Sequence, residues 1–327
     1  MAFIAGGFLN AIGHKAYTEH ADMYAAKKLF EKVFGSVGPI HSLSLGEPIY
    51  NGYHRENVAA ANALIKPLGL LSDYKPLVVP SNLRIGIDPR GDLVLIGGPV
   101  STVLTQIAWE YSGPEGRALR RPENPIVPLR WYGVSDAKDA SIARDFPISW
   151  KMEGAGEVGP TVNWPFEDTI TGMRIRPEPG EMVTVRVQKA YVPKDNYLLI
   201  TRLPNFLSPD FGELLSLDPS VWPHLLVFEG SHGIGTRAAE LLVSSVGLKA
   251  LQEAERELRG ATEFQVLFRV TGFDLGLNDL TGESFHKFHQ IELLDDGVWP
   301  LDFLDDNIYR RAHEYANDAL QHFMLQT

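Results

Sequence analysis

The stretch His224–Val243, HLLVFEGSHGIGTRAAELLV, decides the predicted fold of this chain. It starts as a short apolar run, continues through the glycine loop Gly230–Thr236, and ends with apolar residues at helical spacing. A strand, a glycine loop and a helix in this order direct backbone N–H groups and a helix N-terminus at one point, which suits a phosphate or another anion. The stretch therefore predicts where a ligand lies, but it names no reaction.

A second stretch, Asp92–Tyr111 (DLVLIGGPVSTVLTQIAWEY), has the same order of strand, glycines, hydroxyl residues and helix. Two apolar strands of this kind are typical of a parallel sheet that is covered on both faces. Right-handed crossovers then place both glycine loops at one edge of the sheet. We therefore predict an α/β fold of the Rossmann-like class, with a mostly parallel sheet, helices on both faces and a β-rich insertion.

The remaining pattern divides the chain into four parts: an N-terminal helical segment (1–37), the first half of the α/β domain (38–130), the insertion (131–195) and the second half (196–327). The insertion is rich in Pro and Gly and has short alternating runs, which favours short strands. The insertion is either a lid over the glycine loops or an elaborated sheet edge.

Near the C-terminus, Asp295–Gly297 has the residue types of a hairpin turn.

Composition restricts the function. The formal charge is −11, from 41 acidic and 30 basic residues, so we expect no direct nucleic-acid binding. The chain has no cysteine, which excludes disulfides, thiolate nucleophiles and Cys-ligated metals. No window reaches the roughly 20 apolar residues of a membrane span, and the N-terminus lacks a signal-peptide pattern. We therefore expect a cytoplasmic protein without a membrane partner.

Two nucleotide motifs fit the main loop only in part. Gly233, Gly235 and Ala238 match the dinucleotide pattern G-x-G-x-x-G/A, but no carboxylate follows at the expected distance in a suitable place. Read from Gly230, the loop resembles a P-loop as far as Gly235, but Thr236 stands where the Lys must be and Arg237 where its hydroxyl neighbour must be. Arg237 could instead donate two hydrogen bonds to a phosphate.

The predicted ligand-binding residues follow three strands. Arg202 and Asn205 come after the strand Tyr197–Thr201, and we expect them at the same sheet edge as the glycine loops. The alternative is that the glycines only allow a tight turn. The loop residues in the predicted site are Gly97, Gly98, Ser101, Thr102, Gly230, Ser231, Gly233, Gly235, Thr236 and Arg237.

Three residues are candidates for acid–base chemistry. Glu47 lies in a polar and aromatic loop that would suit a nucleobase and a ribose, Glu229 ends the main strand, and His232 lies between glycines. A carboxylate at a ribose can also stabilise cleavage of an N-glycosidic bond. We predict no metal site, because His286 and His289 lie on opposite faces of an alternating strand.

These observations leave three hypotheses for the function. The first is a sensor that binds a nucleotide or a nucleotide-derived ligand, with no other cofactor identified. The second is an enzyme that hydrolyses a nucleotide or its N-glycosidic bond through Glu47, Glu229 and His232. The third is an interaction subunit in which terminal helices, such as the amphipathic Asp22–Phe34, bind a partner protein or form a homo-oligomer.

Overall fold

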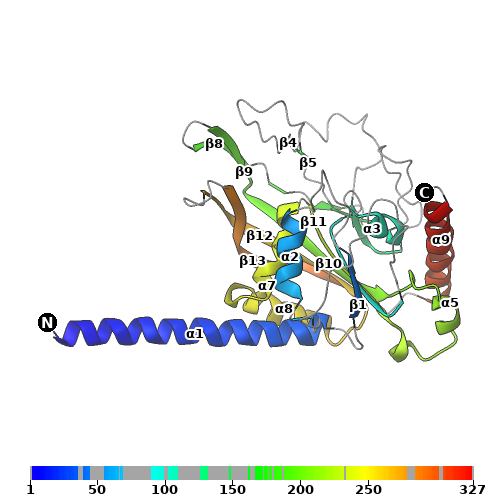
Figure 1. Ribbon diagram of the computed structural model, residues 1–327, viewed down its shortest axis with the longest axis horizontal. Helices are drawn as coiled ribbons and strands as arrows, with labels where there is room; N and C mark the ends of the chain where they lie inside the picture. Colours follow the sequence, from blue (N-terminus) through cyan, green and yellow to red (C-terminus); the bar gives the residue numbers. More distant parts are fainter. Residues whose placement is uncertain are drawn as a thin grey trace.

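A mixed six-stranded sheet lies at the centre of the protein (Figure 1). The computed structural model describes residues 2–35, 40–44, 55–65, 67–68, 90–98, 102–109, 126–131, 147–148, 161–162, 166–171, 173–175, 177–178, 180–185, 188–231, 233–277, 284–301 and 305–325. In spatial order, the strands of this sheet are β1 (Ile40–Ser44), β2 (Asp92–Ile96), β11 (His224–Gly230), β10 (Asp195–Pro204), β12 (Phe264–Leu277) and β13 (Ser284–Pro300).

The direction of the strands corrects the predicted fold class. The pairs β1–β2 and β2–β11 are parallel. The pairs β11–β10, β10–β12 and β12–β13 are antiparallel, so a mostly parallel Rossmann-like sheet is wrong. The prediction failed because β10 is buried along its whole length, and a strand covered on both faces shows the same continuous apolar run in either direction.

Helices cover one face of the sheet, which we call the α8 face. Val94, Ile96, Leu226 and Phe228 point into this layer and form its core with the helices. The elements on this side are α1 (Ala2–Phe34), α2 (Arg55–Leu64), α6 (Gly233–Arg237), α7 (Ala239–Leu242), the 3-10 turn η2 (Ser245–Gly247) and α8 (Leu248–Leu258).

The opposite face, which we call the α3 face, carries the second core. Leu93, Leu95, Leu225 and Val227 point into it. Its elements are α3 (Val103–Ala108), α5 (Phe211–Leu214), η1 (Pro219–Val221), α9 (Asp306–Leu325) and a small sheet of β3 (Leu129–Trp131), β6 (Phe166–Asp168) and β7 (Arg174–Ile175).

The predicted insertion contains short strands, as its composition indicates. Besides β6 and β7, its described strands are β4 (Pro147–Ile148), β5 (Thr161–Val162), β8 (Glu181–Val185) and β9 (Gln188–Val192). The Gln265 side chain on β12 donates to Leu129 O and accepts from Leu129 N, both at 2.8 Å. These two bonds fasten the small sheet to the central one.

Helix α1 extends beyond the rest of the molecule as a 33-residue arm (Figure 1). Phe30 and Phe34 at its C-terminal end are buried, and Phe30 stacks on Phe228 with ring centroids 6.2 Å apart. Tyr17 and Tyr24, nearer the tip, are 77% and 62% exposed. Among the α1 side chains that are described (residues 16–34), the buried ones lie in the last turns of the helix, which therefore belong to the core. Among the described residues, no helix combines the length and the apolar character that a membrane crossing needs.

The segment Asp295–Gly297 is a bulge inside β13 and not the predicted hairpin turn. The register with β12 shifts between Phe268 and Val266, and Asp296 has a φ of 56°. A Cβ on Gly297 would lie 2.8 Å from Leu267 O, so only glycine allows this close approach. Turn residue types therefore marked a local irregularity correctly but not the end of a strand.

Candidate functional site

The two glycine loops begin at the same edge of the sheet, as the sequence predicted. Strands β2 and β11 are parallel neighbours, and Ile96 pairs with Phe228 at their carboxyl ends. Gly97 and Gly230 follow within two residues of this pair, so both loops leave the sheet together. Three predicted site residues, Glu47, Ser101 and His232, lie outside the described residues.

Backbone N–H groups of the loops bind the protein itself. Gly97 N donates to Phe228 O at 2.8 Å, and Ser231 N donates to Tyr197 O at 3.1 Å. Gly230 N donates to Thr236 Oγ1 at 3.0 Å, so the Thr236 hydroxyl closes the loop from inside. An N–H group that already donates within the protein is not directed at a ligand. This weakens the prediction that the loop N–H groups bind a phosphate.

The loop glycines have different roles. Gly97 has a φ of 121°, which side chains rarely allow. A Cβ on Gly235 would overlap Asn196 Oδ1 and Tyr197 O, so Gly235 lets α6 pack directly on β10. A Cβ on Gly233 would make only an ordinary contact, 3.5 Å from the Glu56 side chain. Gly97 and Gly235 therefore have structural roles that require no ligand.

Arg237, the predicted phosphate contact, lies beside the carboxylate of Glu240, three residues further along the chain. Its Nε lies 3.4 Å from Glu240 Oε1, and the Arg237 side chain is 17% exposed. This pairing gives the guanidinium a partner within the protein and leaves its role at a phosphate without structural support.

Glu229 is a deeply buried carboxylate at this edge. It is 1% exposed, and its Oε2 accepts a hydrogen bond from Trp109 Nε1 at 3.2 Å. Trp109 directly follows α3, so Glu229 faces the α3 side of the sheet, as alternation from Leu225 and Val227 requires. A charged group at this depth is costly unless hydrogen bonds compensate for lost water.

Two buried hydroxyls at the same edge make no hydrogen bond within the described part of the chain. They are Thr102 Oγ1 and Ser231 Oγ, on residues that are 2% and 0% exposed. Thr102 occupies the N-cap position of α3, but its side chain makes no hydrogen bond that caps the helix. Buried polar groups in proteins are nearly always satisfied, so these hydroxyls can take a partner outside the described residues, such as a ligand, a water molecule or another part of the chain.

Ser231 and Glu229 share the α3 face. The bond from Ser231 N to Tyr197 O continues the antiparallel ladder of β11 and β10, and residues opposite each other in such a ladder point to the same face. Tyr197 belongs to the core of the α3 face, and burial raises its pKa to about 12. Thr102, Trp109, Tyr197, Glu229 and Ser231 all lie at this edge of the sheet, and we call them the edge cluster.

A charged clamp borders the edge cluster along β10. Asp195 is fully buried, and its Oδ2 accepts from Arg269 Nε at 2.8 Å. Arg269 Nη2 also donates to Glu178 Oε1 at 2.9 Å, and Glu178 N donates to Asp195 Oδ1 at 2.6 Å. Burial raises the pKa of Asp195 above its usual value despite these donors. The clamp holds the segment around Glu178 against the sheet.

Arg202 and Asn205 lie at the opposite end of the sheet, which corrects the predicted site. Because β10 runs antiparallel to β11, Arg202 pairs with Leu226 and Pro204 with His224, at the start of β11. Asn205 Nδ2 donates to Gly91 O at 2.7 Å, just before β2 begins. Neither residue can act with the glycine loops, because the length of the strands separates them.

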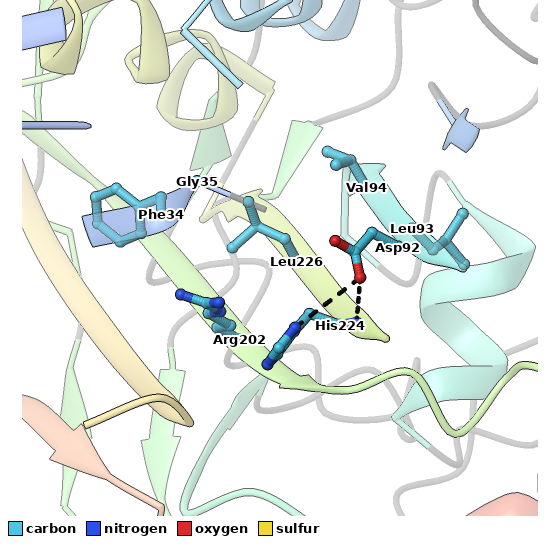
Figure 2. A pocket seen from close by; sticks show the side chains of 8 residues that line it. All are labelled: Phe34, Gly35, Asp92, Leu93, Val94, Arg202, His224 and Leu226. Atoms are coloured by element: carbon cyan, nitrogen blue, oxygen red, sulfur yellow. Dashed lines mark hydrogen bonds and ion pairs between the residues drawn. The ribbon is translucent and has the colours of Figure 1, made fainter. Parts of the chain in front are cut away.

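Arg202 instead lines a small cavity beneath the end of α1 (Figure 2). Its Nη1 donates to Val33 O at 3.4 Å, and Asp92 Oδ1 nearby accepts from His224 N at 2.6 Å. Burial, followed by the charge of Arg202, lowers the pKa of His224 to about 4. The cavity measures about 10 Å³, which holds about one water molecule. We therefore interpret this group as a support for α1.

Sequence reasoning missed Trp109, Tyr197 and the clamp. Trp109 follows directly on the helix after the first glycine loop, and a buried indole N–H needs an acceptor, which was the available signal. Glu229 was a predicted site residue because it ends the main strand, next to the glycine loop. The clamp joins Glu178, Asp195 and Arg269 through tertiary contacts that no local pattern reveals.

The fold and the edge cluster define this chain as a mixed α/β protein with a buried polar group at the carboxyl ends of two parallel strands. Comparisons of the chain with family models, with curated proteins and with solved structures gave no match.

Proposed function

We propose that this protein binds a nucleotide-derived small molecule at the edge cluster and acts as a sensor of that ligand. One observation carries the proposal: two buried hydroxyls without a partner among the described residues lie at the same edge as the buried Glu229 carboxylate. A polar ligand supplies the missing partners, and carboxyl ends of parallel strands are a common place for ligands in α/β proteins.

The edge cluster has the composition that a sugar and an aromatic base require. A carboxylate and two hydroxyls recognise polar ligand groups, and the indole of Trp109 adds an apolar surface. The acidic net charge of the chain also favours a small ligand over a nucleic acid, since a polyanion would be repelled.

A thermal-shift screen of ribonucleosides and ribonucleotides tests the proposal. We expect at least one compound to raise the melting temperature of the wild-type protein, and Ser231→Ala to weaken that shift. Ser231→Ala leaves the packing in place and removes a hydroxyl that makes no described hydrogen bond, so its unliganded stability should equal that of the wild type. A screen in which no compound shifts the melting temperature would refute ligand binding.

The buried carboxylate also supports a second candidate, in which the same ligand is cleaved. Glu229 could stabilise positive charge that develops on a ribose during hydrolysis of an N-glycosidic bond, and Glu47 and His232 remain candidates for proton transfer. Chromatography of the bound nucleotide after incubation separates the two functions. Recovery of unchanged ligand supports the sensor, and product formation that Glu229→Gln abolishes supports the enzyme.

The exposed arm of α1 supports a third candidate, binding of a partner protein or of a second copy of the chain. Tyr17 and Tyr24 are exposed on α1, and the α1 side chains that are described as buried lie at its C-terminal end. Light scattering of the wild type and of a variant that lacks residues 2–22 tests this role. This deletion keeps Phe30 and Phe34 in the core, so a change in mass reports on the arm and not on unfolding.

A further inference from the structure

The small cavity beneath the end of α1 is bordered on two sides, by the central sheet and by the helix (Figure 2). Of its eight lining residues, six belong to β2, β10 and β11, and two, Phe34 and Gly35, lie at the end of α1. The strands are held by ladder pairs, such as Leu226 with Arg202 and with Val94. The end of α1 lies outside these ladders, so it can leave the cavity while the sheet stays intact.

Arg202 holds this end of α1 through a backbone carbonyl. Its Nη1 donates to Val33 O at 3.4 Å, and the residue is buried. The last four carbonyls of a helix have no partner within the helix and carry the negative end of its dipole. The guanidinium of Arg202 therefore stabilises the end of α1 both as a hydrogen-bond donor and as a positive charge.

His224 lies in the same cavity wall as Arg202. Its Nδ1 is buried, makes no hydrogen bond to the described residues, and lies 3.9 Å from Asp92 Oδ1. That carboxylate oxygen already accepts from the backbone N–H of His224 at 2.6 Å. A proton on the ring would add a second positive charge beside Arg202 in a buried place. Burial, and then the charge of Arg202, lower the pKa of His224 to about 4, so the closed cavity keeps the ring neutral.

The described surroundings offer a protonated His224 little compensation. The carboxylates whose charge acts on His224 or Arg202 are Asp92 on β2 and Glu263 just before β12, and Glu263 also accepts from the Tyr309 hydroxyl. The end of α1 contributes only uncharged residues to the cavity wall. The charged residues of its last turns form pairs at the surface, Glu31 with Lys28 and Lys32 with Glu255. A second positive charge in the cavity therefore needs water from outside.

We propose that the proton on His224 controls how firmly the sheet holds the end of α1. A neutral His224 leaves Arg202 bound to Val33 O with the cavity closed. A protonated His224 repels Arg202, and the end of α1 opens so that water reaches both cations. The arm is then attached firmly near neutral pH and loosely in acid. This property is separate from the proposed ligand site, which lies at the other end of β11.

Hydrogen exchange at the end of α1 tests the proposal on the full-length protein. Gly35 N donates to Glu31 O at 2.9 Å, so opening of this end exposes a hydrogen-bonded amide. The pKa of His224 is about 4 in the closed state and near 6.5 in the open one, so the open state binds more protons between these values. We expect the opening equilibrium, from rates corrected for the intrinsic effect of pH, to rise by up to about 20-fold from about pH 7 to about pH 5.

Amides of the central strand β11 provide the reference for local opening. They are buried in the middle of the sheet, so they exchange through a larger unfolding event. At each pH, the end of α1 should therefore be less protected than β11. Equal protection of the two segments, falling together in acid, would show that the whole protein unfolds and would overturn the proposal.

Three variants assign the effect to its residues. His224→Gln has no proton to gain in this range, so the acid rise in opening should shrink to within about twofold. His20→Gln is the matched control, because His20 is exposed on α1 itself and its loss should leave the full rise.

Arg202→Gln removes the neighbouring cation, so this variant should open more at neutral pH and respond less to acid. A His224→Gln protein that opens in acid like the wild type overturns the role of His224. An Arg202→Gln protein with the wild-type response shows that Arg202 does not hold the end of α1.

Discussion

Trp109 donates its indole N–H to Oε2 of Glu229 across 3.2 Å and thereby joins the helix after the first glycine loop to the strand before the second. Both residues are buried, at 5% and 1% exposure. The bond links the two units that the sequence had shown to be similar, and it stabilises a carboxylate at the edge where both loops begin.

Trp109→Phe should lower the free energy of unfolding by about 1–3 kcal/mol, because the variant leaves a buried carboxylate oxygen with one donor fewer. Urea denaturation followed by far-UV circular dichroism measures this loss. A double-mutant cycle with Glu229→Met isolates the bond from the change in ring volume. Additive effects of the two substitutions would contradict the interaction.

Gly235→Ala and Gly233→Ala form a matched pair within one short helix. The Cβ at position 235 overlaps Asn196 Oδ1 and Tyr197 O, so we expect a loss of about 1–3 kcal/mol or more from overpacking. The Cβ at position 233 meets Glu56 at ordinary distance, so Gly233→Ala should be neutral or stabilising, since alanine favours a helix. Thermal melting of both variants decides the point, and equal losses would show that close packing of α6 on β10 is not the reason for Gly235.

His224 should make the protein less stable as the pH falls. Its pKa is about 4 in the folded protein against 6.5 in an unfolded chain, so the unfolded chain binds more protons between these values. Stability from this group is complete above pH 6.5 and decreases toward pH 4, by at most about 3 kcal/mol. Urea titrations at several pH values should show a smaller acid loss for His224→Gln than for the wild type. The exposed His289→Gln serves as control, and an unchanged pH slope in His224→Gln would refute the prediction.

Arg269→Met should destabilise the protein by about 3 kcal/mol near neutral pH, because it removes the partner of the buried Asp195 carboxylate. The pKa of Asp195 is already raised by burial, and loss of Arg269 raises it further. A raised carboxyl pKa favours folding at low pH and costs stability as the pH rises through it, so the deficit of the variant should shrink in acid. Unfolding in urea at acidic and neutral pH tests this, and a deficit independent of pH would point to lost packing alone.

Adding Asp195→Asn to the Arg269→Met variant provides a second test of the clamp. The amide carries no charge, so the double variant Arg269→Met with Asp195→Asn should recover part of the lost stability at neutral pH. No recovery would show that Arg269 acts mainly through Glu178 at the surface.

The elements near the glycine loops were predictable because their signals are local. The ends of β2 and α8 have local signals in the sequence, since Gly97 directly follows the apolar run of β2 and Gly260 comes two residues after the regular apolar spacing of α8. The shared edge of the two loops also followed from the sequence, because each loop follows an apolar strand and β2 and β11 proved to be parallel neighbours.

The direction of β10 was decided only in the tertiary structure. Its apolar run is equally consistent with either direction when both faces of the sheet are covered, and this ambiguity placed Arg202 and Asn205 at the wrong end of the site. Direction depends on which strands pair, and pairing is a long-range choice between competing contacts.

The sequence by itself thus determined where glycine loops follow strands and which polar residues lie next to those loops, since both depend on neighbouring residues. The tertiary structure alone decided that Trp109 meets Glu229, that Ser231 and Thr102 are buried without described partners, and that Asp195 pairs with Arg269. These contacts join residues that lie far apart in the chain or depend on burial, and burial exists only once both faces of the sheet are covered.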